Sequence, residues 1–295
     1  MILVDYSQTA IAAVYAEAKG EFASAVMSED MIRHIILNTL RNYKVMFGAE
    51  YGKLIVCTDS RNYWRYDLHP NYKGTRKKKK EDSTLDWKEV HRIMDKVRSE
   101  IDLHLPFPVI HVDRCEADDI IAVLTKMSQD DVDDSSLFGE PKPTLIISSD
   151  TDYVQLQRYP NVKQYSPMFK QMVKAKVSPI YDLNYKLVVG DSGDCIPGIK
   201  SDLNCLFEGI RQTPTKETEK VAWSTNIACV PDKYQSRLEQ NRDLIDMTRI
   251  PVQYEKAILR EYQSKANEVK KNGPLWQYFA TNGLNELLSN INDFN

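Results

Sequence analysis

Residues 145–152 read Leu-Ile-Ile-Ser-Ser-Asp-Thr-Asp, a short apolar run that ends in two aspartates. Such a run predicts a buried strand of a parallel sheet, which would carry Asp150 and Asp152 to the carboxyl edge where open α/β sheets bind ligands. Two further runs repeat the design, since residues 1–4 lead into Asp5 and residues 53–58 lead into Asp59. A fourth run, residues 107–112, is soon followed by three acidic residues, Glu116, Asp118 and Asp119. Four strands that end in carboxylates indicate one metal site.

Electrostatic repulsion supports this interpretation. Two carboxylates about 6 Å apart repel by roughly 2 to 3 kcal/mol at an effective dielectric constant near 20. Several such pairs would consume much of a folding stability of about 5 to 15 kcal/mol. A shifted pKa relieves one pair, but a larger all-oxygen cluster without a neighbouring His or Cys favours Mg²⁺ or Mn²⁺.

Each acidic residue also has an ordinary structural interpretation when it is taken alone. Aspartates at strand ends act as turn formers and helix caps, and residues 116–119 could favour a helix amino terminus through the macrodipole. Asp150 and Asp152 would point to opposite faces of an extended strand, unless a turn begins directly after Asp150. The coincidence of four strands favours the metal site.

Composition bounds the class of protein. The chain has 295 residues, 42% of them hydrophobic, and can bury a substantial core in one large domain or two. Its five cysteines are odd in number and lack paired metal-site spacing, which indicates reduced intracellular thiols. We see no basic leader and no apolar run near the roughly 18 residues of a membrane span, so we expect a cytoplasmic protein without a membrane segment.

The stretch from residue 61 to residue 84 differs from its surroundings. Residues 61–80 carry eight Lys or Arg against one acidic residue, although the net charge of the chain is −3, and aromatic residues are interleaved with the cations. This composition predicts a basic arch over about residues 60–85 that grips a polyanion and stacks on its bases. The lysine run at 77–80 could equally be a solvated loop, and Trp64 and Tyr66 could be core residues.

Helical and strand patterns place these motifs in an α/β fold. A helix capped by Ser28 and closed by Gly48 connects the first two strands, and further helices are expected over about 86–103 and 116–127. Short strands are expected at 162–166 and 171–177, and Pro179 opens another helix. Beyond residue 200 the apolar spacing is mostly helical. We therefore expect an α/β core with a mostly parallel sheet flanked by helices over residues 1–190, and a helical duplex-binding part over residues 191–295.

Taken together, these motifs resemble the 5′ nuclease family, which includes flap endonucleases and the 5′ nuclease domains of bacterial DNA polymerases. The resemblance covers nearly the whole chain, is closest to bacteriophage members, and rests on the stretches 3–8, 33–38, 63–65, 116–119, 146–152, 159–164 and 291–294. It implies a PIN-like 5′ nuclease fold with a helix-hairpin-helix element around residues 190–199. Cys195 stands where the family pattern has asparagine, and Lys200 stands where it has glycine.

The resemblance also implies roles for individual residues. It implies two Mg²⁺ ions, which Mn²⁺ could replace, and a K⁺ ion at the hairpin. The residues matching the first metal cluster are Asp5, Asp59, Glu116, Asp118 and Asp150, with Asp119 adjacent and acting through water. Those matching the second are Asp152, Asp191 and Asp194. Lys73 and Arg65 match cations that contact the scissile phosphate. Nucleic-acid contacts are implied for Tyr72, Arg76, Lys77, Lys78, Lys79, Lys80, Gly198, Ile199 and Lys200.

The function implied is a 5′-to-3′ exonuclease and flap endonuclease that acts on RNA·DNA and DNA duplexes and removes RNA primers during replication. We expect a monomer whose partners include a single-stranded DNA-binding protein or a sliding clamp. Two alternatives stay open: a non-catalytic nucleic-acid-binding protein with the same fold, and a metal phosphohydrolase of small substrates. The basic arch argues against the second alternative, and salt-dependent duplex binding would discriminate between them.

Overall fold

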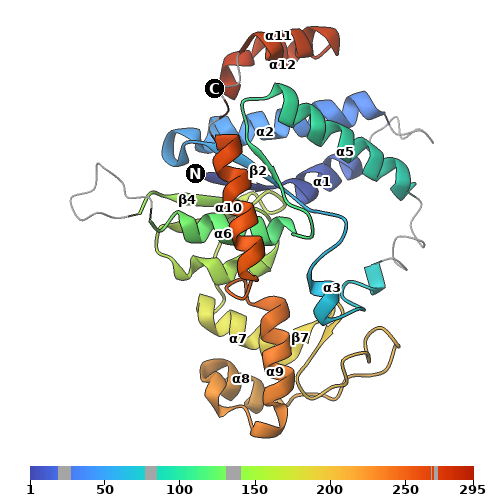
Figure 1. Ribbon diagram of the computed structural model, residues 1–295, viewed down its shortest axis with the longest axis vertical. Helices are drawn as coiled ribbons and strands as arrows, with labels where there is room; N and C mark the ends of the chain where they lie inside the picture. Colours follow the sequence, from blue (N-terminus) through green and yellow to red (C-terminus); the bar gives the residue numbers. More distant parts are fainter. Residues whose placement is uncertain (19–27, 77–84, 131–140, 267, 269–271) are drawn as a thin grey trace.

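A six-stranded sheet lies at the centre of the computed structural model, which describes residues 1–18, 28–76, 85–130, 141–266, 268 and 272–295. The strand order is β3-β2-β1-β4-β5-β6 (Figure 1). The strands are β1 (Ile2–Asp5), β2 (Leu54–Thr58), β3 (Val109–His111), β4 (Thr144–Ile147), β5 (Val162–Ser166) and β6 (Gln171–Val173). All pairings are parallel except that of β5 with β6. The predicted mostly parallel sheet is therefore confirmed.

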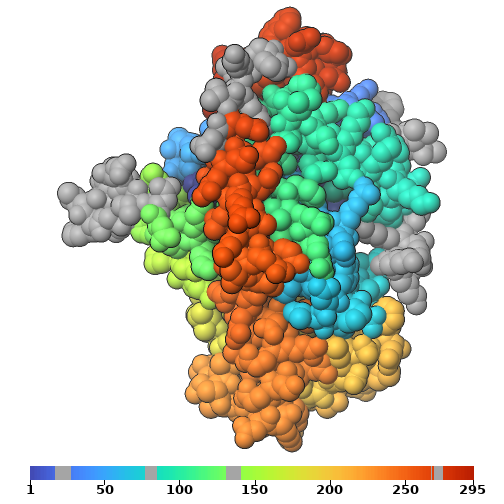
Figure 2. Space-filling view, viewed as in Figure 1, coloured from blue at the N-terminus to red at the C-terminus, as the bar shows by residue number. Residues whose placement is uncertain are grey.

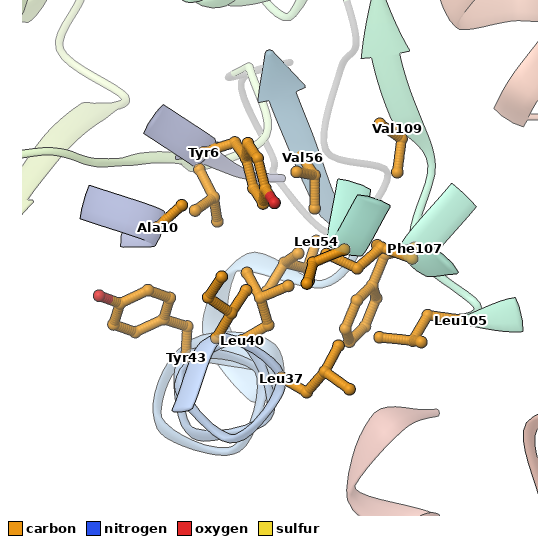
Figure 3. Close-up of a cluster of buried hydrophobic side chains, with 14 of the residues drawn as sticks. Tyr6, Ala10, Leu37, Leu40, Tyr43, Leu54, Val56, Leu105, Phe107 and Val109 are labelled. Atoms are coloured by element: carbon orange, nitrogen blue, oxygen red, sulfur yellow. The ribbon is translucent and has the colours of Figure 1, made fainter. Parts of the chain in front are cut away.

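Helices cover both faces of this sheet, as the continuous apolar strands require. One face packs on α1 (Tyr6–Ala18), α2 (Glu29–Tyr51) and α5 (Trp87–His104), and the other on α6 (Ala117–Met127). Figure 3 shows Leu54, Val56 and Val109 of the strands meeting Leu37 and Leu40 of α2. Successive strand residues point to opposite faces of the sheet, so the side chains on both faces are buried under helices. The acidic residues at the strand ends lie at the carboxyl edge of the sheet.

The helix α2 confirms one predicted boundary and corrects the other. Ser28 caps its amino terminus, since its side chain accepts a hydrogen bond from the backbone N–H of Met31. Gly48 was expected to close the helix but lies inside it. The helix instead ends at Gly52, whose φ of 76° is the left-handed conformation that glycine adopts at no steric cost.

A second group of elements follows the sheet. It comprises η1 (Thr151–Arg158), α7 (Pro179–Val189), β7 (Gly190–Asp191), β8 (Ile196–Pro197), α8 (Glu217–Thr225), η2 (Ile227–Cys229) and α9 (Asp232–Ile245), of which α7 to α9 lie at the bottom of Figure 1. β7 and β8 pair antiparallel and form a short β-hairpin where the helix-hairpin-helix element was expected, and α7 precedes this hairpin. Turns and loop occupy residues 198–216, so the next helix, α8, does not follow the hairpin directly.

The last helices return to the α/β core. They are α10 (Val252–Ala266), α11 (Asn272–Thr281), α12 (Asn285–Ser289) and η3 (Ile291–Phe294). Figure 2 shows α9 and α10 as an orange strip along one face, and α10 packs on α6 and β3. Lys265 of α10 pairs with Asp102 of α5 at 2.8 Å. The last helices thus pack into the same hydrophobic core as the first strand and helices of the chain. No helix in the described ranges is long and apolar enough to cross a membrane.

The described base of the arch, residues 61–76, is folded. It contains α3 (Arg65–Leu68) and a series of turns, and it buries Trp64, Arg65 and Tyr72. The base of the expected arch is thus packed against the rest of the protein, and Trp64 is a core residue, one of the two alternatives left open for it. The aromatic side chains of this base pack against the elements around the hairpin, where Tyr72 joins the cluster formed by α7, α8 and α9. The predicted lysine run, Lys77 to Lys80, lies outside the described residues.

Candidate active site

Three of the predicted carboxylates meet at the carboxyl edge of the sheet. Asp5 ends β1, Asp59 follows β2, and Asp150 follows β4 as the cap of η1. A turn does begin after Asp150, since its side chain accepts a hydrogen bond from the N–H of Asp152 at 2.9 Å. Burial raises the pKa of Asp5 to about 7, and the nearby charges of Asp59 and Asp150 add to that rise. These three groups therefore share one electrostatic environment.

Each of these carboxylates is held by neighbouring donors. Asp5 accepts hydrogen bonds from the N–H of Gln8 at 3.1 Å and from the hydroxyl of Ser148 at 3.2 Å. Asp59 accepts from the hydroxyl of Ser7 and from the N–H of Ala117 at 2.9 Å. The contact with Ala117 links the end of β2 to the first turn of α6. The amino terminus of α6 is thereby fixed beside the sheet edge.

The first turn of α6 supplies the other predicted ligands of the first cluster. Asp118 is half-buried, its desolvation raises its pKa well above the ordinary value, and it accepts a hydrogen bond from the hydroxyl of Tyr153. Glu116 is the residue that caps α6 and is completely buried. Asp119 points away from this group, because it accepts from the backbone N–H of Glu116 at 2.9 Å and from the indole N–H of Trp64 at 3.0 Å. Asp119 thus acts as a helix-capping and ion-pairing residue.

Arg65 does not lie where the resemblance implies. Its side chain is 4% exposed, and its guanidinium pairs with Glu116 at 2.7 Å and with Asp119 at 2.8 Å. Its Nε donates to the carbonyl of Leu244 at 3.0 Å, and its charge lies 4.4 Å from the centre of the Trp64 ring. A group held in this way cannot reach a phosphate without breaking a buried ion pair. The phosphate contact implied for Arg65 stays a prediction, while in this structure its guanidinium holds Glu116 in position.

Lys73 and its neighbours reach the site from the arch base. The ammonium group of Lys73 pairs with Glu116 and lies 3.9 Å from Asp194, while Arg76 pairs with Asp194 from the surface. Tyr72 is buried and its hydroxyl donates to Glu116 at 3.0 Å and to Asp194 at 3.1 Å. Because its ring is buried here, the nucleic-acid contact implied for Tyr72 stays a prediction. Lys73 contacts a carboxylate of each group, Glu116 and Asp194.

The second carboxylate group forms between η1 and the hairpin. Lys186 of α7 bridges two of its members, because its ammonium group pairs with Asp152 and with Asp191 at 2.7 Å. Burial raises the pKa of Asp152 to about 6, although the charge of Lys186 opposes the rise. Sequence reasoning missed Lys186. The signal was its place on α7, one helical turn before the hairpin that carries Asp191 and Asp194.

One small cavity lies between Asp118 of the first group and the three carboxylates of the second. It holds about 10 Å³ and is bordered by Asp118, Asp152, Asp191 and Asp194 together with Arg65 and Tyr72. A larger cleft of about 760 Å³, lined by Asp59, Tyr63 and Arg76 among others, lies between α1, α5 and the arch base. The predicted residues are thus brought together, with a broad opening beside Asp59.

The carboxylates are not arranged around a common point, however. Among the residues that the structure describes, no three Asp, Glu, His or Cys side chains could together hold one metal ion as they stand. Several of these carboxylates are engaged in ion pairs: Lys73 pairs with Glu116, Arg76 with Asp194, and Lys186 with Asp152 and Asp191. The donor set is nonetheless all oxygen and rich in charge, which suits Mg²⁺ or Mn²⁺. These side chains would have to turn away from their present partners to coordinate a metal.

The hairpin residues predicted to hold duplex are occupied within the protein. Gly198 and Ile199 are buried, and the N–H of Gly198 donates to the side chain of Gln212 at 2.8 Å. Lys200 pairs with Glu219 at 2.5 Å and lies 5.2 Å from the centre of the Trp223 ring. In this arrangement none of the three presents a free donor to a phosphate. The structure therefore does not place these residues at an open nucleic-acid surface.

This fold and site define the class of protein: an α/β protein with two carboxylate groups at the sheet edge and a basic segment above them. Comparison with known proteins agrees. Residues 1–182 match the family model described as the 5′-3′ exonuclease N-terminal resolvase-like domain, and residues 177–294 match the model of the T4 RNase H C-terminal domain. The chain therefore belongs to the 5′-3′ exonuclease family.

Individual relatives are consistent with this assignment. The chain is 34% identical to ribonuclease H of Enterobacteria phage T4, over 99% of this chain and 95% of that protein. It is 20% identical to DNA polymerase I of Streptococcus pneumoniae, over 70% of this chain and 24% of that protein.

Solved structures show the same fold. A bacteriophage T5 flap endonuclease, solved with DNA and metal ions, matches with a TM-score of 0.61 at 17% identity, over 90% of this chain and 97% of that chain. A T5 5′-exonuclease with bound divalent zinc ions also matches with a TM-score of 0.61 at 17% identity, over 90% of this chain and 99% of that chain.

Proposed function

We propose that the protein is a Mg²⁺-dependent 5′-to-3′ exonuclease and flap endonuclease that cleaves RNA·DNA and DNA duplexes and removes RNA primers. The observation that carries this proposal is a cavity lined by Asp118 and the second carboxylate group, together with a cation-lined cleft at Asp59. A binding protein has no need for acidic side chains that face a phosphate chain. The relatives named above support the reaction class, since one is a ribonuclease H and another a flap endonuclease.

The residues divide into two proposed metal sites. Asp5, Asp59, Asp118 and Asp150 would hold the first ion, with Glu116 at its border. The residues for the second ion would be Asp152, Asp191 and Asp194. Divalent ions bound there would supply an activated water and stabilise the leaving oxygen of a phosphodiester. We also propose that Mn²⁺ can replace Mg²⁺. We also propose a K⁺ ion at the hairpin, held by main-chain oxygens.

The chain's own groups would act on the scissile phosphate as follows. Lys73 would exchange its contact with Glu116 for a phosphate oxygen and neutralise charge as the bond breaks. Arg76, which is half exposed, would bind the neighbouring phosphate. Arg65 would keep Glu116 in place and thus fix the first turn of α6. The arch lysines at 77–80 would extend this cationic path, and we propose that they contact the nucleic-acid backbone.

The test is cleavage of a 5′-labelled primer, RNA or DNA, annealed to a DNA template with and without a flap. We expect short 5′ products in Mg²⁺, none in EDTA, and none from the Asp150→Asn variant. Asp243→Asn is a matched control, because Asp243 lies on α9 and its nearest cation, Arg249, is 3.9 Å away. Retained cleavage by Asp150→Asn would exclude Asp150 as a ligand.

A non-catalytic binding protein is the second candidate, and the ion pairs between the carboxylates and Lys73 or Lys186 favour it. Tight duplex binding without cleavage in either Mg²⁺ or Mn²⁺ would support it. For either function we propose a monomer, with residues 1–190 carrying the reaction and residues 191–295 contributing to duplex binding. Partner proteins such as a single-stranded DNA-binding protein or a sliding clamp are proposed on the resemblance alone.

A further inference from the structure

The turn between β5 and β6 exposes large apolar side chains at its tip. Met168 is 75% exposed and Phe169 is 65% exposed, and Met172 on β6 is 40% exposed. Turn tips normally carry Gly, Asn, Asp, Ser or Pro, because these residues favour turn conformations and solvent. Adjacent exposed apolar residues on one hairpin are more typical of a binding surface. This tip, residues 167–170, therefore requires an explanation other than folding.

Hydrogen bonds fix the tip to the candidate active site. The N–H of Met168 donates to the hydroxyl of Ser149 at 3.2 Å, and the hydroxyls of Ser149 and Ser166 lie 2.7 Å apart. Ser149 directly precedes Asp150. The buried side chain of Gln164 donates to the carbonyl of Asp150 at 2.6 Å. The exposed tip is thus held rigidly beside a carboxylate at the sheet edge.

The charge around the tip identifies the kind of occupant. Residues 162–178 contain four lysines and no Asp or Glu, in a chain whose net charge is −3. Lys170, Lys174 and Lys176 are exposed. The last two line a groove of about 500 Å³ between η1 and α7 that extends to Asp152. The groove also contains Asp152 and Asp182, but the segment that carries the exposed apolar side chains is itself purely cationic. Apolar side chains flanked by lysines match a polyanion that also offers flat apolar faces, which describes nucleic acid.

We propose that Met168 and Phe169 stack against the terminal base pair of the duplex bound at the candidate site, while the neighbouring lysines contact its phosphates. This inference rests on the proposed function and adds to it a residue pair that sets the position of the duplex end. Phe and Met side chains are among those that proteins insert against base steps. A rigid apolar stop beside Asp150 would fix which phosphodiester bond faces the carboxylates.

Binding in EDTA separates this contact from cleavage. The probe is a primer–template duplex with 2-aminopurine at its terminal pair, titrated with the protein while fluorescence is recorded. We expect Phe169→Ala to weaken binding about 5- to 150-fold, the range that corresponds to one stacked base, and to remove the fluorescence change. Phe169→Tyr should keep both the wild-type affinity and the fluorescence change. Leu103→Ala is the matched control, since Leu103 is 71% exposed on α5 and should leave both unchanged.

The outcomes separate the two proposals. If wild-type protein cleaves in Mg²⁺ while Phe169→Ala and the double variant with Met168→Ala bind as wild type does, the stacking inference fails and the nuclease stands. Such a result would assign the exposed tip to a protein partner instead. A wild-type protein that neither binds the duplex nor cleaves it would overturn the proposed function and this inference with it. Equal weakening of binding to duplex and to unpaired single strands would also refute stacking on a terminal pair.

Discussion

Replacing Arg65 by alanine distinguishes a phosphate-binding arginine from one that holds the site together. The guanidinium makes contacts of 2.7 Å and 2.8 Å with two fully buried carboxylates, Glu116 and Asp119, and a third hydrogen bond to the carbonyl of Leu244. Removing one partner of a buried pair leaves the other charge uncompensated and typically costs about 3 to 5 kcal/mol. Two carboxylates would be uncovered here. We therefore expect a loss in the upper part of that range.

Such a loss is large against a total folding stability of about 5 to 15 kcal/mol. At about 2 °C per kcal/mol for a chain of this size, a loss of about 4 to 5 kcal/mol should lower the melting temperature by about 8 to 10 °C. The assay is thermal or urea unfolding followed by circular dichroism, in EDTA so that metal binding does not contribute. Arg61→Ala is the matched control, because Arg61 is 83% exposed four residues earlier and its pair with Asp95 is solvent-accessible.

Two results would refute the structural role of Arg65. If Arg65→Ala has the melting temperature of the wild type but cleaves slowly, Arg65 contacts the phosphate, as the family resemblance implies. A variant in which Arg65→Lys retains full stability would show that the planar, forked guanidinium is not needed to bridge two carboxylates. We expect instead that Arg65→Lys recovers only part of the stability lost in Arg65→Ala, since one ammonium group cannot reproduce the geometry of all three contacts.

Three further predictions concern the site and the hairpin. Lys73→Ala should lower the single-turnover cleavage rate by about 100-fold or more with little change in duplex affinity, because Lys73 would stabilise developing charge. Lys126→Ala, on the surface of α6, should leave the rate unchanged. Gly190→Ala should disrupt the hairpin, because the added Cβ would lie 2.3 Å from the carbonyl oxygen of Ile196 at a φ of 78°. The Gly190→Ala protein should therefore melt well below Gly48→Ala, in which the new methyl meets only the flexible side chain of Lys44. Folding raises the pKa of Asp5 to about 7, so the folded state binds the extra proton and stability in EDTA should fall as the pH rises from about 4 to 7. Asp5→Asn should make this fall smaller, leaving the part due to Asp118 and Asp152, and an unchanged pH profile would contradict the raised pKa of Asp5.

The sequence predicted the position of the carboxylates because their placement follows from strand periodicity. Asp5, Asp59 and Asp150 each follow a short apolar run, and parallel strands deliver their ends to one edge whatever the details of packing. The cap at Ser28 was predictable for a similar reason, since it depends on a few neighbouring residues. Local rules therefore covered the sheet and the sheet-edge group.

The arch base shows why the rest could not be predicted. Arg65 and Tyr72 lie in a stretch whose composition is that of a solvated basic loop, yet both are buried. Their burial depends on partners far along the chain, namely Glu116, Asp194 and the carbonyl of Leu244. No pattern within residues 61–84 encodes those contacts. The role of Lys186 was missed for the same reason, because only the folded chain brings it between two carboxylates.

The cations that pair with the carboxylates differ in their freedom to move. This difference determines which carboxylates are free to bind a metal ion. Arg65 is fixed by three buried contacts, so Glu116 stays occupied by it and by the hydroxyl of Tyr72 even if Lys73 leaves. Asp150, by contrast, is exposed and has no ion pair within the described residues. We therefore expect Asp150→Asn to weaken the Mg²⁺-dependent rise in melting temperature far more than Glu116→Gln, which should instead lower stability in EDTA. The reverse order, with Glu116→Gln abolishing the Mg²⁺ response while its EDTA stability is unchanged, would mean that Glu116 exchanges Arg65 for metal.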